Sequence, residues 1–165
     1  MISLQPAHSM PPLATPKKAA SAISGRRVMT RSPSARRSAM ADRQGGCSCG
    51  QLRFIVQGDP LRVGVCHCLD CRKHHGALFF AAAVFAENTV KITGRSASHK
   101  GRHICPDCGS SVYAVSGGEV ELHLGAFDAP DQFTPTYELW TDRRDSWLTP
   151  ISGAAQHARA RDANN

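Results

Sequence analysis

Seven cysteines fall into three tight groups in the 165-residue chain, and their spacing points to metal binding. The central group has three thiols within six residues, and the flanking groups are pairs: Cys66, Cys68 and Cys71; Cys47 with Cys49; Cys105 with Cys108. Thiolates separated by one or two residues can converge on one soft cation, because a tight turn directs their Sγ atoms to one point. An odd number of clustered cysteines, with no apolar signal segment before them, favours zinc in a reducing compartment, the cytoplasm, over disulfides.

The two flanking pairs supply four thiolates, enough to close a tetrahedral coordination sphere. A closed site leaves no position for a substrate, so we expect Cys47, Cys49, Cys105 and Cys108 to hold a structural zinc. The alternative is that these four are buried free cysteines. A C-x-x-C pair followed by Gly109 is typical of a zinc-binding turn, which favours the metal.

The central triplet supplies three thiolates and leaves one coordination position for water or an incoming ligand. We therefore expect Cys66, Cys68 and Cys71 to hold a second, catalytic zinc, which makes two zinc ions per chain. Three thiolates around a divalent ion carry one negative charge, so the ion is a weak Lewis acid toward water but takes up an added thiol readily. The alternative is a second structural site, completed by His67 or by a cysteine of a partner chain.

The positive charge of the chain lies in its N-terminal segment. Residues 1–41 contain seven Lys and Arg and no acidic residue, whereas the 13 bases and 13 acids of residues 42–165 cancel. A nucleic-acid partner is therefore not expected for the domain. Segment 1–41 is rich in Ser, Ala, Pro and Arg, so we expect a disordered basic tail, either a targeting segment or translation upstream of a start at Met40.

Short alternating apolar stretches predict a mostly β domain over residues 42–151, followed by a polar C-terminal tail over 152–165 that frays. The expected strands are Gln51–Gln57, Leu61–Val65, Ala77–Phe85, Thr89–Thr93, Val112–Val115, Glu119–Leu124 and Tyr137–Thr141. Short helical turns are expected after Cys68 and around Asp128–Phe133. No stretch of about 18 apolar residues is present, so no membrane span is expected.

The cysteine motifs together resemble one known family. The resemblance covers about Gly45 to Leu148 and rests on Gly46-Cys47-Ser48-Cys49-Gly50, Cys66-His67-Cys68-x-x-Cys71-Arg72, Cys105-x-x-Cys108-Gly109, Trp140, Asp142 and Ser146-Trp147-Leu148. These residues resemble the glutathione-dependent formaldehyde-activating enzyme family, whose domain is shared with centromere protein V. The resemblance implies a zinc-stapled β-tent of short antiparallel strands, with the outer cysteine pairs on a structural zinc and the triplet on a catalytic one.

Two segments depart from the family pattern: Gly94–Ile104 is short, and His74-His75-Gly76 replaces small polar residues. Arg72 is a candidate for binding a substrate carboxylate, because a guanidinium can bind a carboxylate through two hydrogen bonds. We expect Trp140 and Trp147 to belong to the core.

The function that we expect is that of a zinc-dependent carbon-sulfur lyase-like enzyme. By resemblance, its substrates are a small thiol such as glutathione and an aldehyde such as formaldehyde, joined as S-(hydroxymethyl)glutathione. The alternative is a non-catalytic, zinc-scaffolded protein-binding module. A pocket beside an open metal position favours the enzyme, and a closed site beneath a flat surface favours the module.

Overall fold

The computed structural model of the chain describes residues 42–161, which fold mainly into β-strands. The strands are β1 (Arg43–Gly46), β2 (Arg53–Val56), β3 (Arg62–Cys66), β4 (Phe80–Ala86), β5 (Val90–Thr93), β6 (Ala97–His99), β7 (Arg102–Ile104), β8 (Ser111–Ser116), β9 (Glu119–His123), β10 (Tyr137–Leu139) and β11 (Ala155–His157). The α-helix is α1 (Leu69–His75), and short 3₁₀ turns are η1 (Glu87–Thr89), η2 (Leu124–Ala126) and η3 (Thr141–Arg143). The predicted mostly β fold is confirmed. The predictions for residues 1–41 lie outside the described residues.

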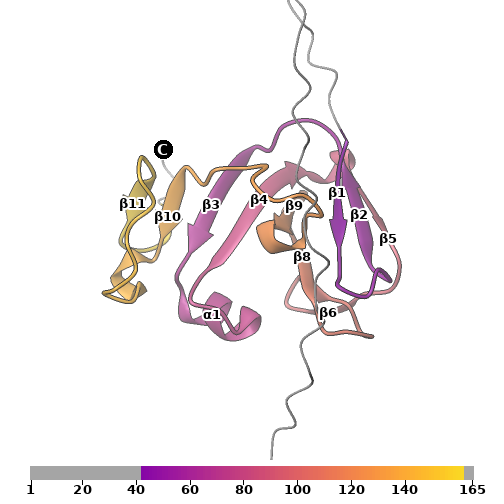
Figure 1. The fold of residues 1–165 in the computed structure, drawn as a ribbon, viewed down its shortest axis with the longest axis horizontal. Helices are drawn as coiled ribbons and strands as arrows, with labels where there is room; N and C mark the ends of the chain where they lie inside the picture. The colour runs from indigo at the N-terminus through magenta and orange to yellow at the C-terminus, as the bar shows by residue number, and fades with distance from the viewer. Residues whose placement is uncertain (1–41, 162–165) are drawn as a thin grey trace, which may run out of the picture. The chain divides into compact units, whose positions relative to one another are not determined.

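The strands form two sheets. The smaller has the order β1-β2-β5 and the larger the order β11-β10-β3-β4-β9-β8-β7-β6 (Figure 1). Neighbouring strands are antiparallel, except that β10 runs parallel to both β3 and β11. The helix α1 follows β3 directly and leads into β4, so it lies at the end of this central strand pair (Figure 1).

The core lies between one face of the large sheet and the small sheet. Alternation in β2 buries Phe54 and Val56, and alternation in β9 buries Val120 and Leu122. These side chains belong to one buried cluster with Phe85 of β4. Burying a Phe, Leu or Val side chain contributes roughly 1.5–3 kcal/mol, so this cluster is the main noncovalent stabilisation of the domain.

The opposite face of the large sheet carries the small and polar residues that alternate with the core positions. On β3 and β4 these include Gly64 and Ala82, which are paired neighbours, and Tyr137 of β10 pairs with Gly64 from the other side. A Cβ at Gly64 would lie 2.2 Å from two ring carbons of Tyr137. The tyrosine ring therefore lies directly across the glycine, and only glycine fits there.

We expect Gly64→Ala to lower the free energy of unfolding by roughly 1–3 kcal/mol, because the ring of Tyr137 must leave its position. Chemical denaturation measures the change. The control is Gly125→Ala, because a Cβ at Gly125 meets nothing within 4 Å. An equal loss in both variants would contradict the close packing of Tyr137 on Gly64.

Three expectations from the sequence are corrected. Residues Asp128–Phe133 form a bent, irregular loop and not a helical turn, and Phe133 packs from this loop against Phe85 and Phe127. The chain beyond Ile151 does not simply fray, since Ala155–His157 form β11 and pair with β10. Trp147 is not in the core: it is 68% exposed.

Candidate metal centres and the adjoining cavity

The four outer cysteines lie together, as their spacing predicts. Their Sγ atoms are all within 4.8 Å of one another. The Sγ of Cys49 lies 3.4 Å from that of Cys47 and 3.7 Å from that of Cys105. Four tetrahedral sulfurs, each about 2.3 Å from a zinc ion, would lie roughly 3.8 Å apart, so the donor set fits this metal.

Local backbone bonds hold each pair in its turn. The N–H of Gly50 donates to the carbonyl of Cys47, and the N–H of Gly109 donates to the carbonyl of Cys105. The N–H of Leu52 also donates to the Sγ of Cys47 at 3.2 Å. These turns join the β1–β2 hairpin to the loop before β8, so the group links two distant parts of the chain.

The central triplet forms a second group whose three Sγ atoms are also within 4.8 Å of one another. Cys66 ends β3, and Cys68 is the N-cap of α1, where its Sγ accepts from the N–H of Cys71 at 3.4 Å. The helix ends at Gly76, whose left-handed backbone (φ 57°) suits a glycine. Three thiols on a strand end and a helix start converge, and three donors leave a tetrahedral ion one further position.

A cavity of about 230 Å³ lies beside the triplet, on the face of the large sheet opposite the core. Its lining includes the thiol residues Cys66 and Cys71. The other lining residues are mainly apolar or small, with two charged exceptions: Gly64, Val65, Phe80, Ala82, Val84, Tyr137, Leu139, Arg102 and Glu121. An open coordination position at the triplet would therefore face a partly open pocket and not a flat surface.

Arg102 contacts the triplet, a contact that the sequence did not indicate. Its Nη2 lies 3.9 Å from the Sγ of Cys71. The contact with Cys66 lowers the pKa of the Cys71 thiol, and contacts with Cys68 and Arg102 lower it further, although burial opposes them. The same thiol contact and burial raise the pKa of Cys66. The side of the triplet next to Arg102 is thus the side where negative charge is best stabilised.

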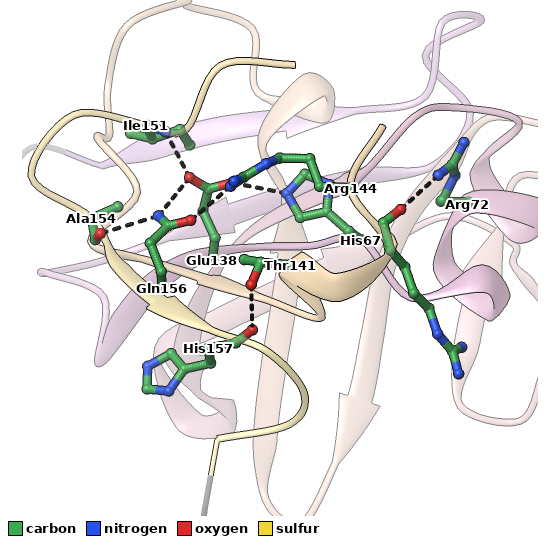
Figure 2. Close-up of polar contacts among 10 residues, drawn as sticks. His67, Arg72, Glu138, Thr141, Arg144, Ile151, Ala154, Gln156 and His157 are labelled. Atoms are coloured by element: carbon green, nitrogen blue, oxygen red, sulfur yellow. Dashed lines mark hydrogen bonds and ion pairs between the residues drawn. The ribbon is translucent and has the colours of Figure 1, made fainter. Parts of the chain in front are cut away.

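His67 points away from the thiols and is anchored by a buried carboxylate. Its Nε2 lies 2.8 Å from Oε2 of Glu138 in β10, and both side chains are at most 3% exposed (Figure 2). Glu138 also accepts from the N–H of Ile151, from Gln156 and from Arg144 (Figure 2). Residues of β10 and β11 therefore fix the side chain of His67, which lies between two candidate metal ligands in the sequence.

The hydrogen bonds decide the protonation of Glu138. Burial alone would raise the pKa of this carboxyl, but the bonds from Gln156, His67, Ile151 and Arg144 outweigh burial and lower the pKa to about 2. The carboxylate is thus ionised at neutral pH. Glu138 is an acidic residue between Tyr137 and Leu139 in an otherwise apolar strand. This pattern is the sequence signal that could have identified it as a buried functional carboxylate.

Arg72, the predicted substrate-binding residue, lies at a different place. Its guanidinium donates to both carboxylate oxygens of Asp145 and to the carbonyl of Arg143. It does not line the cavity beside the triplet. The carboxylate of Asp145 therefore already occupies the guanidinium that was expected to bind a substrate carboxylate, and a substrate role for Arg72 stays a prediction.

The histidines after the triplet pack over the sheet. The ring of His75 stacks on Phe80 with 4.7 Å between centroids and meets His123 edge-on at the same distance. Burial lowers the pKa of His75 to about 4 and that of His123 to about 3, so both imidazoles are neutral at pH 7. Together with Phe80 they line a larger hollow of about 860 Å³ that also borders Cys47 and Cys49.

The comparison with protein families agrees with this geometry. The model of the glutathione-dependent formaldehyde-activating enzyme family matches residues 42–143, which contain all seven cysteines. The chain belongs to this family. A comparison with curated proteins finds no significant match.

The formaldehyde-activating family region ends before part of the network that anchors His67. Glu138 lies inside the matched range, whereas Arg144, Ile151 and Gln156 lie beyond it. The support of the triplet in this chain thus includes residues outside the family match. Within residues 42–161, no helix is long and apolar enough to span a membrane.

Proposed function

We propose that the chain is a zinc-dependent, carbon-sulfur lyase-like enzyme that joins a thiol and an aldehyde or separates their adduct. The family description indicates glutathione and formaldehyde as the pair. In the forward direction the thiol sulfur forms a bond to the carbonyl carbon, and the proton of the thiol ends on the former carbonyl oxygen. The reverse step breaks the same carbon-sulfur bond.

The observation that carries this proposal is the cavity at the triplet. Cys66 and Cys71 line a partly open pocket of about 230 Å³, in contrast to the four-thiol group, whose donors suffice for a complete sphere. Zinc at the triplet would supply a position that takes up an added thiol as thiolate. Zinc in the four-thiol group would have a structural role. A reducing compartment, the cytoplasm, would keep all seven thiols available as ligands.

The protein's own residues have positioning and shielding roles in this proposal. Val65, Phe80 and Leu139 give the cavity apolar walls, which would limit the access of water to the reacting groups. Holding thiol and aldehyde together in so small a space makes their reaction effectively intramolecular. Arg102 beside Cys71 offsets the negative charge of the triplet.

We expect a thiol to enter the coordination sphere of the triplet. In the cobalt-substituted protein, glutathione should strengthen the thiolate-to-cobalt absorption band, because a fourth sulfur replaces an oxygen ligand. Visible absorption during a titration measures the change. S-Methylglutathione, a thioether of similar size, should leave the spectrum unchanged because it forms no thiolate.

The control variant is Cys68→Ser, which should abolish the response. A cobalt protein that shows no spectral change with glutathione, and whose triplet already has a fourth protein ligand, would contradict the enzyme proposal. That result would favour a zinc-scaffolded binding module.

A further inference from the structure

The cavity beside the triplet contains a carboxylate that the proposed chemistry does not use. We propose that Glu121 selects thiols that carry an ammonium group, so that the preferred substrates are aminothiols. This inference rests on the proposed function, because it concerns which thiol enters the same cavity.

The position of Glu121 follows from the alternation of β9. Val120 and Leu122 point into the core, so Glu121 points to the opposite face, where the cavity lies. Its neighbours across the sheet are Val84 of β4 and Ala114 of β8. Neither of these apolar side chains can donate a hydrogen bond to a carboxylate, and Val84 lines the cavity together with Glu121.

Glu121 is half-buried and has no partner of opposite charge. Among residues 42–161, no Lys, Arg or His nitrogen lies within 4.0 Å of its carboxylate. The contrast is Glu119 on the same face of the same strand, which is paired with Arg62 through both oxygens. Arg62 is therefore occupied, and Glu121 is free to bind a cation in the cavity.

Arg102, the other charged residue of the cavity, is directed to the triplet. Its contact with Cys71 places its charge against the thiolates. Three thiolates around a divalent ion carry one negative charge, which Arg102 balances. The charge of Glu121 is then the uncompensated one in the cavity, and a bound cation would neutralise it.

The raised pKa of Glu121 shows that its ionised form is poorly stabilised in the free protein. Burial raises its pKa most strongly; the charge of Arg62 lowers it, that of Glu119 raises it, that of Arg102 lowers it, and the net result is a raised pKa. Tyr137 lines the same cavity, and burial together with the charge of Glu121 raises the pKa of its hydroxyl. A half-buried carboxylate without a partner gains free energy when an ammonium group binds beside it.

The size of the cavity limits the ligand. Pockets for drug-sized ligands have volumes of roughly 300–1,000 Å³, and this cavity has about 230 Å³. It therefore suits a small thiol, or the thiol-bearing part of a larger one, with the ammonium group a few bonds from the sulfur. One end of such a ligand meets Cys66 and Cys71, and the other meets Glu121.

The test compares three thiols of similar size in the cobalt-substituted full chain: cysteamine, 2-mercaptoethanol and 3-mercaptopropionate. Their dissociation constants are measured from the thiolate-to-cobalt band in wild type and in Glu121→Gln. The three thiols differ in their own acidity. The readout is therefore, for each thiol, the ratio of its dissociation constants in wild type and variant, in which that difference cancels. We expect the variant to bind cysteamine about tenfold more weakly, which corresponds to the loss of one charge-assisted hydrogen bond. Its dissociation constant for 2-mercaptoethanol should be unchanged.

Two further variants make the result specific to this carboxylate. Glu121→Lys should reverse the preference and favour 3-mercaptopropionate over cysteamine. Glu87→Gln removes the same charge from an exposed position outside the cavity and should change no ratio. Unchanged binding of 2-mercaptoethanol shows that each variant keeps its fold and its triplet.

The outcomes separate this inference from the proposed function. If all three thiols bind and Glu121→Gln affects them equally, the selection of aminothiols is wrong and the thiol-binding enzyme stands. A second outcome is that the variant weakens cysteamine binding as expected while the zinc protein neither forms nor cleaves an adduct of a thiol with formaldehyde. In that case the lyase-like activity is wrong and the aminothiol site stands. If no thiol binds, both are wrong.

Discussion

Cys105→Ser is expected to unfold the domain. Cys105 is fully buried and belongs to the four-thiol group that joins the β1–β2 turn to the loop before β8. A structural zinc contributes on the order of 10 kcal/mol or more to folding, and the stability of a whole domain is only about 5–15 kcal/mol. The loss of one of four ligands therefore removes a large part of the total. Circular dichroism and elemental analysis measure folding and zinc content.

The matched variant is Cys68→Ser in the triplet. Serine is a good N-cap, so it can still accept the hydrogen bond from Cys71 that begins α1. This variant should lose one of two zinc ions and keep most of its thermal stability. Equal melting temperatures of the two variants would overturn the assignment of one structural and one catalytic site.

Glu138→Ala is expected to lower the free energy of unfolding by roughly 3–5 kcal/mol, the usual effect of breaking a buried charged network. The substitution leaves His67 buried without its partner and leaves Arg144 without a carboxylate. A domain of this size should melt roughly 10–20 °C lower. Differential scanning calorimetry measures the shift.

The triplet should respond to the same substitution. Residues that orient metal ligands typically change metal affinity about 10–100-fold when they are replaced. We therefore expect the triplet of Glu138→Ala to bind cobalt more weakly, and the four-thiol group to bind it unchanged. Asp145→Ala, which removes the partly exposed ion pair with Arg72, should cost less than about 1 kcal/mol. If it destabilises the domain as much as Glu138→Ala does, the special role of the buried network is wrong.

The sequence predicted those elements whose signal is local. Alternation along Glu119–His123 and the hairpin glycines after Ser116 specified β8 and β9 correctly. Cysteine spacing predicted both groups that the structure brings together. The strands that the sequence did not predict are short or polar, such as β6 and β11, and pairing with a neighbour, not composition, makes them strands.

The residues around the triplet could not be predicted from spacing. Arg102 lies 31 residues from Cys71, and Glu138 lies 71 residues from His67. Sheet pairing brings them together, because β10 aligns parallel with β3. Arg72 was the obvious candidate because it is adjacent to the motif, but adjacency in sequence does not direct a helical side chain into the cavity.

The parallel pairing of β10 with β3 also determines the order in which the nascent chain can be completed. All three triplet thiols have left the ribosome long before Glu138 is synthesised, so His67 waits for its acceptor while more than half of the domain is made. During that time β3 is an unpaired sheet edge, the kind of surface at which incomplete chains associate. β10 covers this edge, and the final edge is then β11, a strand of only three residues. The late-synthesised strands β10 and β11 thus replace a longer exposed edge, β3, with a shorter one.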